Sequence, residues 1–399
     1  MSRPVRNHSG QSRNPLASWL RSEALPFWAD SGIDTVTGAC HESVTAVPDA
    51  PAGPEIRRTR VQTRQIYTFS AAHCHHWFDD SASTVGSLQA YLHATSTHPR
   101  HDCVWVHSTT PCGDIASALL DTYDMAFALL ACAWQIRAFG DERASERARV
   151  ICQLLEDRLR ADNGGWLEGN YPSEQRRQNP HMHLLEAFLA LHQSDGSPRW
   201  LELAQRIIAL LEDHFFDPVH GVLLEFFDSN WRPSHQGQVI TAEPGHMAEW
   251  IYLLKQYSTA VGENLHPIAH HFYATVSRLG RDPHSGLLYN RVTATGRPID
   301  GSKRLWPQAE WIKANLVMAE EGVPGAAELA SEGAQQLFRR YMDGCTPGTY
   351  LDLIDADDKP VNTPCPASTL YHLTTAAVAW EEFPPQIANR RPAPAASLS

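Results

Sequence analysis

The sequence lacks a long apolar segment and is poor in basic residues. No apolar run among its 399 residues approaches the roughly 20 residues that cross a bilayer as a helix. Lys and Arg number 33 against 45 Asp and Glu, so the formal net charge is −12. Because nucleic acids and anionic membranes bind clusters of cationic side chains, we expect neither as a partner. The same balance disfavours a highly charged phosphate substrate.

Signals for export, disulfides and nucleotides are also missing. The opening MSRPVRNHSGQSRN has no apolar core of the kind that secretory signal peptides carry. The eight cysteines are scattered and contain no Cys-x-x-Cys pair, so we expect reduced thiols, several of them in the core, and a cytoplasmic protein. The glycine pair in NGGW is typical of a turn and not of a nucleotide-binding loop.

Helical periodicity dominates what is present. The segment 114–140 is apolar on nearly every face, as in a buried helix, whereas 141–160 is amphipathic. This alternation recurs along the chain, and short β-hairpins are predicted at 221–233, 286–299 and 348–361. The predicted helices cover residues 14–27, 57–79, 81–97, 114–139, 141–160, 180–193, 198–214, 243–259, 264–278, 306–320, 324–341 and 367–382.

No linker interrupts the pattern, so residues 14–384 are predicted to form one domain. Residues 1–13 are expected to be a flexible N-terminus, and the Pro- and Ala-rich residues 385–399 a disordered tail. Polar residues recur in the more buried helices at intervals of 59, 60, 63, 64 and 62 residues; they are Arg64, Tyr123, His183, His246, Glu310 and His372. One helix pair and one hairpin occupy about that length. The spacing therefore predicts an all-α fold, an (α/α)6 barrel with short β-hairpins at one rim and these residues around a common pocket.

Three histidines are predicted near helix N-termini. Asn179 is expected to cap one helix, with His183 about a turn further on, and His246 and His372 take similar places in EPGHMAEW and CPASTLYH. The positive end of a helix macrodipole disfavours the imidazolium, so we expect lowered histidine pKa values and neutral rings that accept protons. Glu249, three residues after His246, is expected to fix the tautomer of that histidine.

Each of these residues has a simpler explanation as a cap or a satisfied buried polar group. Their recurrence at matching helix positions favours a functional site instead. A metal site is a second hypothesis, because His-x-x-Glu occurs twice, as in a reversed di-iron motif. Such bundles need two further glutamates, and Glu310 is the one obvious candidate, so no metal is expected. The cluster in SAAHCHHWF is interpreted as a helix end, because adjacent helix positions point in different directions.

Aromatic residues flank the polar set, and aromatic walls with a few fixed polar groups suit a sugar ring. They are Trp28, Tyr67, Tyr123, Trp250, Trp306 and Tyr371.

With these residues in view, the chain resembles the N-acylglucosamine 2-epimerase superfamily, which includes mannose isomerases, sulfoquinovose isomerases and cellobiose 2-epimerases. The resemblance runs from about Phe27 to Glu382, nearly the whole predicted domain. It rests on RVQTRQIYTF, TYDMAFALLA, NPHMHLLEA, EPGHMAEW, RLWPQAEWIKA and STLYHL, in this order. The resemblance implies an (α/α)6 barrel and metal-free catalysis through a cis-enediol, without a cofactor.

The resemblance also implies roles for single residues. His372 matches the base that moves the proton at C2, and His246 matches the second acid/base histidine, which helps to open the ring. Arg64 matches the arginine at the sugar oxygen where negative charge develops. Glu249 and His183 match residues that orient the histidines and bind hydroxyls. Four residues match further pocket positions: Tyr123, Asn179, Trp306 and Glu310.

RLWPQAEWIKA and the compact length most resemble mannose isomerases, which implies interconversion of D-mannose and D-fructose. The expected partner is a monosaccharide, and the expected state a monomer or homodimer. A 2-epimerase acting on an N-acylglucosamine, glucose or cellobiose-type sugar is the first alternative. The others are a non-catalytic carbohydrate-binding protein and a glycoside hydrolase or lyase; the last needs a close pair of acidic residues, which the histidine-rich set does not favour.

Overall fold

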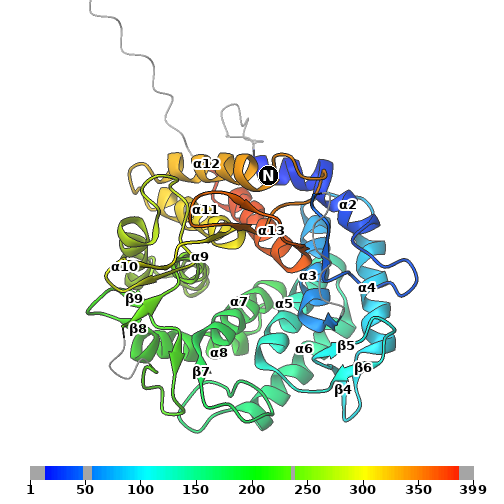
Figure 1. Cartoon of the computed structure of the whole chain (residues 1–399). Coiled ribbons are helices and arrows are strands. Elements are labelled where there is room, and N and C mark those ends of the chain that lie inside the picture. Colours follow the sequence, from blue (N-terminus) through cyan, green and yellow to red (C-terminus); the bar gives the residue numbers. More distant parts are fainter. Residues whose placement is uncertain (1–13, 48–55, 235–238, 386–399) are drawn as a thin grey trace, which may run out of the picture.

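The computed structural model describes residues 14–47, 56–234 and 239–385, so the predicted flexible N-terminus and residues 386–399 of the predicted tail lie outside it. Within this part of the chain, helices form two concentric rings, and successive units run around the barrel in sequence order (Figure 1). The predicted (α/α)6 barrel is confirmed.

Six of the described helices form the inner ring. Each contacts the next along the chain, and the last contacts the first, which closes the barrel. The inner helices are α3 (Thr59–Cys74), α5 (Thr122–Phe139), α7 (Gln178–Asp195), α9 (Pro244–Val261), α11 (Leu305–Glu320) and α13 (Ala367–Glu382). They are buried on nearly all sides. In α5, alanines at 126, 128, 131 and 133 let the neighbouring helices approach closely.

The outer ring covers the inner one, and each outer helix contacts the inner helix before it. Its members are α4 (Ser81–Thr95), α6 (Glu142–Leu154), α8 (Pro198–Leu210), α10 (Pro267–Thr275) and α12 (Ala326–Leu337). Five described helices continue into a single π-helical turn: η1 (Leu20–Ala24), η2 (Leu155–Leu159), η3 (Leu211–Phe215), η4 (Val276–Gly280) and η5 (Phe338–Met342). α6 exposes a charged face and buries the other, the amphipathic pattern that the sequence predicts for 141–160.

The first helix of the chain completes the ring. α1 (Pro15–Trp19) lies on α13, and α2 (Leu25–Asp30) follows it. Asn14 caps α1 by accepting a hydrogen bond from the Ala17 N–H, and its Nδ2 donates to the Ala377 carbonyl at 2.9 Å. The last inner helix thus obtains its outer partner from the beginning of the described chain.

The strands are short and border one rim of the barrel. They are β1 (Ser43–Val44), β2 (Arg57–Arg58), β3 (Thr97–His98), β4 (His101–Trp105), β5 (Ser108–Thr109), β6 (Ile115–Ser117), β7 (Arg176–Arg177), β8 (Phe216–Asp217), β9 (Val222–Leu223), β10 (Phe226–Phe227), β11 (Thr241–Ala242), β12 (Arg291–Thr293), β13 (Pro298–Asp300), β14 (Lys303–Arg304), β15 (Leu353–Ile354), β16 (Pro360–Val361) and β17 (Cys365–Pro366). The predicted hairpins at 286–299 and 348–361 correspond to the pairs β12–β13 and β15–β16.

Two local predictions are wrong. The helix expected from residue 114 begins at Thr122, because β6 pairs with β5 and the Asp121 carboxylate caps α5 at the Asp124 N–H. The hairpin expected at 221–233 is split: β9 pairs with β8, and β10 pairs with β7 of the preceding unit. The Glu225 carbonyl between them accepts a hydrogen bond from the Gln178 N–H, a helix-start donor that needs a partner.

All eight cysteines are free thiols, and four are buried, as the sequence predicts: Cys40, Cys132, Cys152 and Cys365. Among the described residues, none of the helices has both the length and the apolar character required to traverse a bilayer.

Candidate active site

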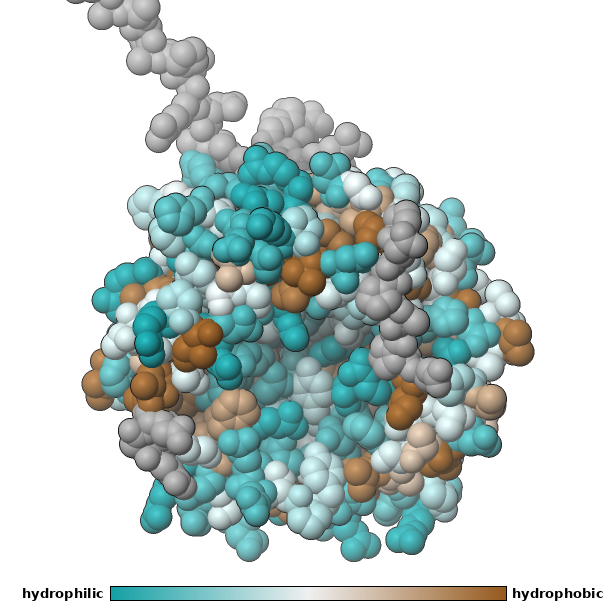
Figure 2. Space-filling view, viewed as in Figure 1, coloured by the Kyte–Doolittle hydropathy of each residue, from teal (hydrophilic) through white to brown (hydrophobic). Residues whose placement is uncertain are grey.

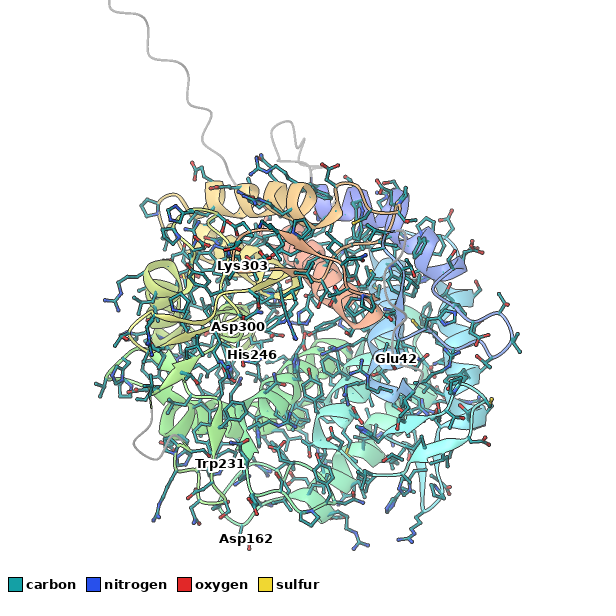
Figure 3. All side chains as sticks on the ribbon, viewed as in Figure 1. Glu42, Asp162, Trp231, His246, Asp300 and Lys303 are labelled. Atoms are coloured by element: carbon teal, nitrogen blue, oxygen red, sulfur yellow. The ribbon has the colours of Figure 1, made fainter. Side chains whose placement is uncertain are left out.

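A cavity of about 500 Å³ opens where the inner helices begin. This volume is in the range of small-molecule sites. Figure 2 shows the hollow at the centre of this face, bordered mainly by hydrophilic residues, and Figure 3 places His246 beside it. Four of the predicted residues line the cavity: Arg64, Tyr123, Asn179 and His246.

The sixth residue of each inner helix belongs to one ring of side chains. These residues are Arg64, Phe127, His183, Glu249, Glu310 and His372. The contacts run from one helix to the next. The Arg64 guanidinium lies 4.0 Å from the centre of the Phe127 ring, the Phe127 and His183 rings are 4.5 Å apart, and His183 Nδ1 is 3.9 Å from Glu249 Oε1. Oxygen atoms of Glu249 and Glu310 approach within 4.8 Å, and Glu310 Oε1 lies 2.7 Å from His372 Nδ1.

His372 is oriented by a carboxylate that a buried lysine holds. Glu310 receives the His372 Nδ1–H with one oxygen, and its other oxygen lies 2.6 Å from Lys313 Nζ. Burial lowers the pKa of His372 well below its usual value, and the charges of Arg64 and Lys313 lower it further. His372 is therefore neutral at pH 7, and its Nε2 can accept a proton.

His246 has the opposite charge state. Its Nδ1 lies 3.0 Å from Glu225 Oε2 and 3.4 Å from Glu243 Oε2. Burial lowers the pKa of His246, but the two carboxylates outweigh burial and raise the pKa to about 10. The sequence-based expectation of a lowered pKa is wrong for this residue, because two close carboxylates act more strongly than the helix dipole. Glu249 is also not its main partner.

Asn179 supports both charge states of His246. The Asn179 side-chain amide lies 2.8 Å from His246 Nε2. Its NH2 group can donate to a neutral ring, and its oxygen, turned towards the ring, can accept from an imidazolium. α7 begins at Gln178, and its N-cap is Arg177. The prediction that Asn179 caps this helix is therefore wrong. Asn179 lies in the first helical turn, and it lines the cavity.

His183 and Glu249 lie one layer deeper. His183 Nδ1 is 3.1 Å from Glu186 Oε2, and the Tyr371 hydroxyl donates to the same carboxylate. Burial lowers the pKa of His183. Burial and the nearby Glu310 raise the pKa of Glu249 well above its usual value, which favours a protonated carboxyl group. Glu249 Oε1 has no hydrogen-bond partner among the described residues.

Arg64 lines the cavity, whereas Trp306 lies against the two histidines. Arg64 donates a 2.8 Å hydrogen bond to the Tyr123 hydroxyl. The Trp306 ring contacts both acid/base candidates, with ring centres 5.2 Å from His246 and 5.3 Å from His372. A flat aromatic side chain thus packs against both histidines, which agrees with a site for a small ring.

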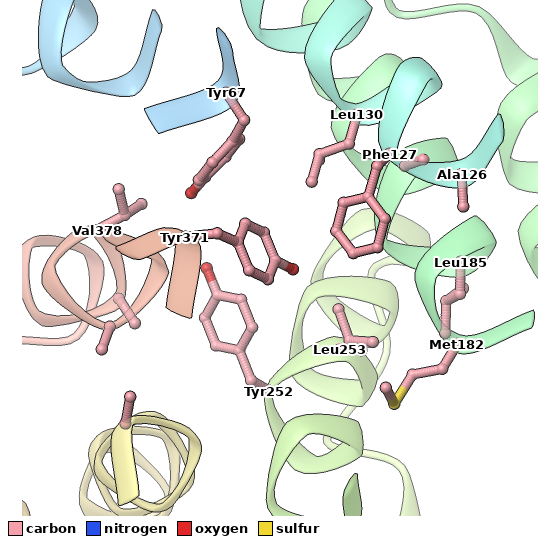
Figure 4. Close-up of a cluster of buried hydrophobic side chains, with 14 of the residues drawn as sticks. Tyr67, Ala126, Phe127, Leu130, Met182, Leu185, Tyr252, Leu253, Tyr371 and Val378 are labelled. Carbon is pink, nitrogen blue, oxygen red and sulfur yellow. The ribbon is translucent and has the colours of Figure 1, made fainter. Parts of the chain in front are cut away.

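Other aromatic residues form the floor below the cavity. Tyr67, Tyr371 and Tyr252 approach one another from α3, α13 and α9, and Phe127 faces them (Figure 4). Trp28 and Trp250 do not line the cavity; they are fully buried, and their indole N–H groups donate to Gly348 O and Gln178 Oε1. The sequence-based assignment of these two tryptophans to the pocket wall is wrong.

Sequence reasoning missed Glu225 and Lys313, although each has a signal. Glu225 is the one charged residue in GVLLEFF, and Lys313 interrupts the apolar segment WIKANLVM. A lone charge in an apolar segment indicates a buried partner. His73, His75 and His76, in contrast, lie at the C-terminal end of α3, where His75 stacks on Trp77.

Within residues 14–47, 56–234 and 239–385, two groups of side chains have metal-ligating atoms within 4.8 Å of one another: His183, Glu186 and Glu249, and Glu249, Glu310 and His372. The second group already contacts the Lys313 ammonium, 2.6 Å from Glu310. That ammonium supplies the positive charge that these carboxylates need and would repel a divalent ion. The geometry favours proton transfer over metal coordination here.

The barrel and its histidine–carboxylate pocket define an enzyme of the sugar epimerase and isomerase class. A family profile described as N-acylglucosamine 2-epimerase (GlcNAc 2-epimerase) matches residues 48–376. This match spans most of the chain, and the chain belongs to that family.

Named relatives divide between two activities. A "Mannose-6-phosphate isomerase" of Rhizobium meliloti (strain 1021) is 33% identical over 381 residues, covering 92% of this chain and 96% of the relative. A "D-mannose isomerase" of Thermobifida fusca is 27% identical, covering 76% and 81%. Among solved structures, a D-mannose isomerase superposes with a TM-score of 0.81 at 19% identity, covering 94% of this chain and all of that one. The cellobiose 2-epimerase of Spirochaeta thermophila gives 0.78 at 23%, covering 91% and 94%. At these identities the structures support the fold alone.

Gly245 permits the packing of Trp306. A Cβ at Gly245 would lie 2.6 Å from the Trp306 ring and 2.9 Å from Pro307 Cβ. We therefore expect Gly245→Ala to displace the indole from the two histidines and to lower kcat about tenfold or more. Steady-state kinetics on the sugar substrate tests this. Gly86→Ala is the control, because a Cβ there meets nothing within 4 Å on helix α4. It should keep kcat and stabilise the fold by about 0.5–1 kcal/mol; unchanged kcat in Gly245→Ala contradicts the prediction.

Lys313 is expected to serve both stability and catalysis. Lys313→Met leaves buried Glu310 without its cation, and breaking such a pair costs about 3–5 kcal/mol. The measurement is thermal unfolding and kcat of Lys313→Met and of the double variant Lys313→Met/Glu310→Gln. The double variant should regain most of the Tm but remain slow, because His372 Nδ1 then contacts an amide and not a carboxylate. Recovery of both Tm and kcat in the double variant would show that the pair has no part in catalysis.

Proposed function

We propose that the protein interconverts an aldose and a ketose of the mannose–fructose type, in the simplest case D-mannose and D-fructose, through a cis-enediol. The observation that carries this proposal is the different set of charged partners around two neighbouring histidines. Glu310, which also contacts Lys313, binds His372 Nδ1, whereas Glu225 and Glu243 both approach His246 Nδ1. These surroundings lower the pKa of His372 and raise that of His246, which favours a neutral and a protonated ring at pH 7. A neutral imidazole can remove a carbon-bound proton, while an imidazolium can donate to a sugar oxygen. The mannose isomerase names of several relatives support the same reaction.

The proposed reaction begins with ring opening: His246 donates a proton to the ring oxygen, the bond between C1 and that oxygen breaks, and the C1 hydroxyl returns its proton to His246 as the C1 carbonyl forms. His372 Nε2 then removes the C2 proton, and its electron pair forms the C1–C2 double bond as negative charge moves to O1. Arg64 stabilises that charge at the cavity wall. When the O2 proton moves to O1 and His372 returns its proton to C1, the C2 carbonyl forms and the product is the ketose.

The main alternative, 2-epimerisation, uses the same enediol and returns a proton to C2 from the opposite face. His246 is the candidate donor for that face, because it comes from α9 and His372 from α13. Relatives named cellobiose 2-epimerase support this alternative. The proton's destination distinguishes the two reactions.

Turnover in D₂O tests the reaction type. We expect D-mannose to give D-fructose with deuterium at C1, observed by proton NMR, because the enediol is protonated at C1. Deuterium at C2 of an aldose product would instead establish epimerisation. His372→Asn and His246→Asn should each reduce turnover by about 10²–10⁴-fold while sugar binding persists. Full activity in both variants would refute the histidine mechanism and favour a binding protein.

The pH dependence follows from the two pKa directions. kcat/KM should rise as His372 loses its proton, below the ordinary histidine pKa, and should fall at high pH as His246 loses its proton near its pKa of about 10. Glu225→Gln removes the nearest carboxylate from His246, so its pKa falls and the alkaline limb moves to lower pH. Glu146→Gln, on the exposed face of α6, is the charge-matched control. If the alkaline limb stays at the same pH in Glu225→Gln, that limb does not report the deprotonation of His246.

A further inference from the structure

The residues that precede the inner helices form a second ring. It lies nearer the solvent than the ring formed by the sixth residue of each inner helix. The six N-cap residues are Arg58, Asp121, Arg177, Glu243, Arg304 and Pro366. Arginine therefore occupies every second unit around the cavity mouth. We call Arg58, Arg177 and Arg304 the arginine collar.

A repeated strand pattern builds the collar. β2, β7 and β14 each contain two basic residues immediately before an inner helix: Arg57–Arg58, Arg176–Arg177 and Lys303–Arg304. Successive strand residues point to opposite sides. The first residue of each pair is accordingly buried, whereas the collar arginine that follows is exposed or half-exposed. Since inner helices begin at one rim, the three collar side chains belong to the same mouth.

Two collar arginines are held by buried carboxylates in the same way. Glu42 accepts the Arg58 backbone N–H and its Nε–H, the latter at 2.8 Å, and Glu168 accepts the Arg177 backbone N–H and Nε–H at 2.8 and 2.7 Å. The glutamate side chains are 1% and 4% exposed, whereas the arginine side chains are 35% and 39% exposed. The anions are thus hidden and the cations are presented to the solvent.

Each of these two arginines has one guanidinium nitrogen that does not contact its glutamate. Nε and Nη2 face the glutamate, and Nη1 of Arg58 and of Arg177 makes no hydrogen bond to any residue in 14–47, 56–234 or 239–385. Both residues line the cavity. The Arg304 side chain is exposed and makes no hydrogen bond or ion pair within the same ranges. It does not line the cavity itself, but its charge acts on the cavity residue Glu243, whose pKa is raised by burial, a rise that Arg304 partly offsets. Fixed guanidinium edges directed at a cavity suit an anion with several oxygens.

We propose that the arginine collar binds a phosphomonoester on the end of the sugar remote from C1 and C2, so that the substrate is a hexose phosphate. This proposal rests on the proposed isomerase function, because the reacting carbons must lie at His246 and His372. A carboxylate would need only one such guanidinium edge, whereas three cations from three helix starts match a tetrahedral dianion. The N-termini of α3, α7 and α11 add positive dipole charge at the same rim. The net charge of the chain predicts against a phosphate substrate, whereas the local positive charge of the collar favours one.

The test compares D-mannose with D-mannose 6-phosphate on the full-length protein. We expect kcat/KM to be at least about tenfold higher, and the Kd from calorimetry correspondingly lower, for the phosphorylated sugar. Arg304→Gln, which breaks no ion pair among the described residues, should lower this preference about tenfold, mainly through KM. Arg149→Gln carries the same charge change on the exposed face of α6 and should leave the preference unchanged. The double variant Arg58→Gln/Glu42→Gln tests the second arginine without leaving its buried glutamate unpaired.

The outcomes separate this proposal from the proposed function. If mannose 6-phosphate neither binds more tightly than mannose nor reacts faster, the collar proposal fails even though mannose turnover supports the isomerase. If neither sugar reacts, the isomerase proposal fails, while calorimetry still decides whether the collar binds a phosphorylated sugar. Inorganic phosphate is the third probe. Competitive inhibition that weakens in Arg304→Gln supports the collar, whereas inhibition without preference for the phosphorylated sugar shows binding of free phosphate and overturns the substrate assignment.

Discussion

The common level at which the six inner helices begin determines where every functional group lies. The ring of side chains that includes Arg64, Glu310 and His372 comes from positions about sixty residues apart, yet each member is the sixth residue of its helix. Short strands hold the helix starts, and the closure of α13 on α3 fixes the circle. A shift of α13 by one residue would turn His372 through about 100° and away from Glu310. The fold therefore constrains the chemistry through register more than through any single contact.

Charge compensation is the second constraint on this pocket. Glu186, Glu249 and Glu310 are all buried near one another, and ionised carboxylates in such surroundings are costly unless they are paired. Lys313, itself buried, faces Glu310 at 2.6 Å from a position one turn further along α11, and Glu249 carries a raised pKa. The floor of the barrel thus helps to set which groups of the ring hold protons. Residues that do not line the cavity are part of its chemistry for this reason.

Periodicity and spacing were sufficient to predict the barrel, because a helix pair has a characteristic length and an apolar pattern of its own. The same spacing identified four of the six ring residues, Arg64, His183, Glu310 and His372, without structural information. It assigned Tyr123 and His246 where the equivalent positions hold Phe127 and Glu249, since a regular interval cannot reveal helix starts that vary by several residues. The spacing of polar residues could not predict which strands pair between units. Glu225 meets His246 because β10 pairs with β7, a contact between segments 50 residues apart.

The two acid/base histidines show how tertiary contacts override a local rule. Both lie near a helix N-terminus, whose dipole is worth about 1 kcal/mol, less than one pKa unit. His372 follows the rule in direction, but burial and two cations account for most of its lowered pKa. His246 departs from it, because Glu225 and Glu243 converge on its Nδ1 from a strand connection and a helix cap. Identical side chains at equivalent helix ends thereby become a proton acceptor and a proton donor. This division requires only the placement of carboxylates, and in the proposed mechanism it lets one pocket both remove and supply a proton.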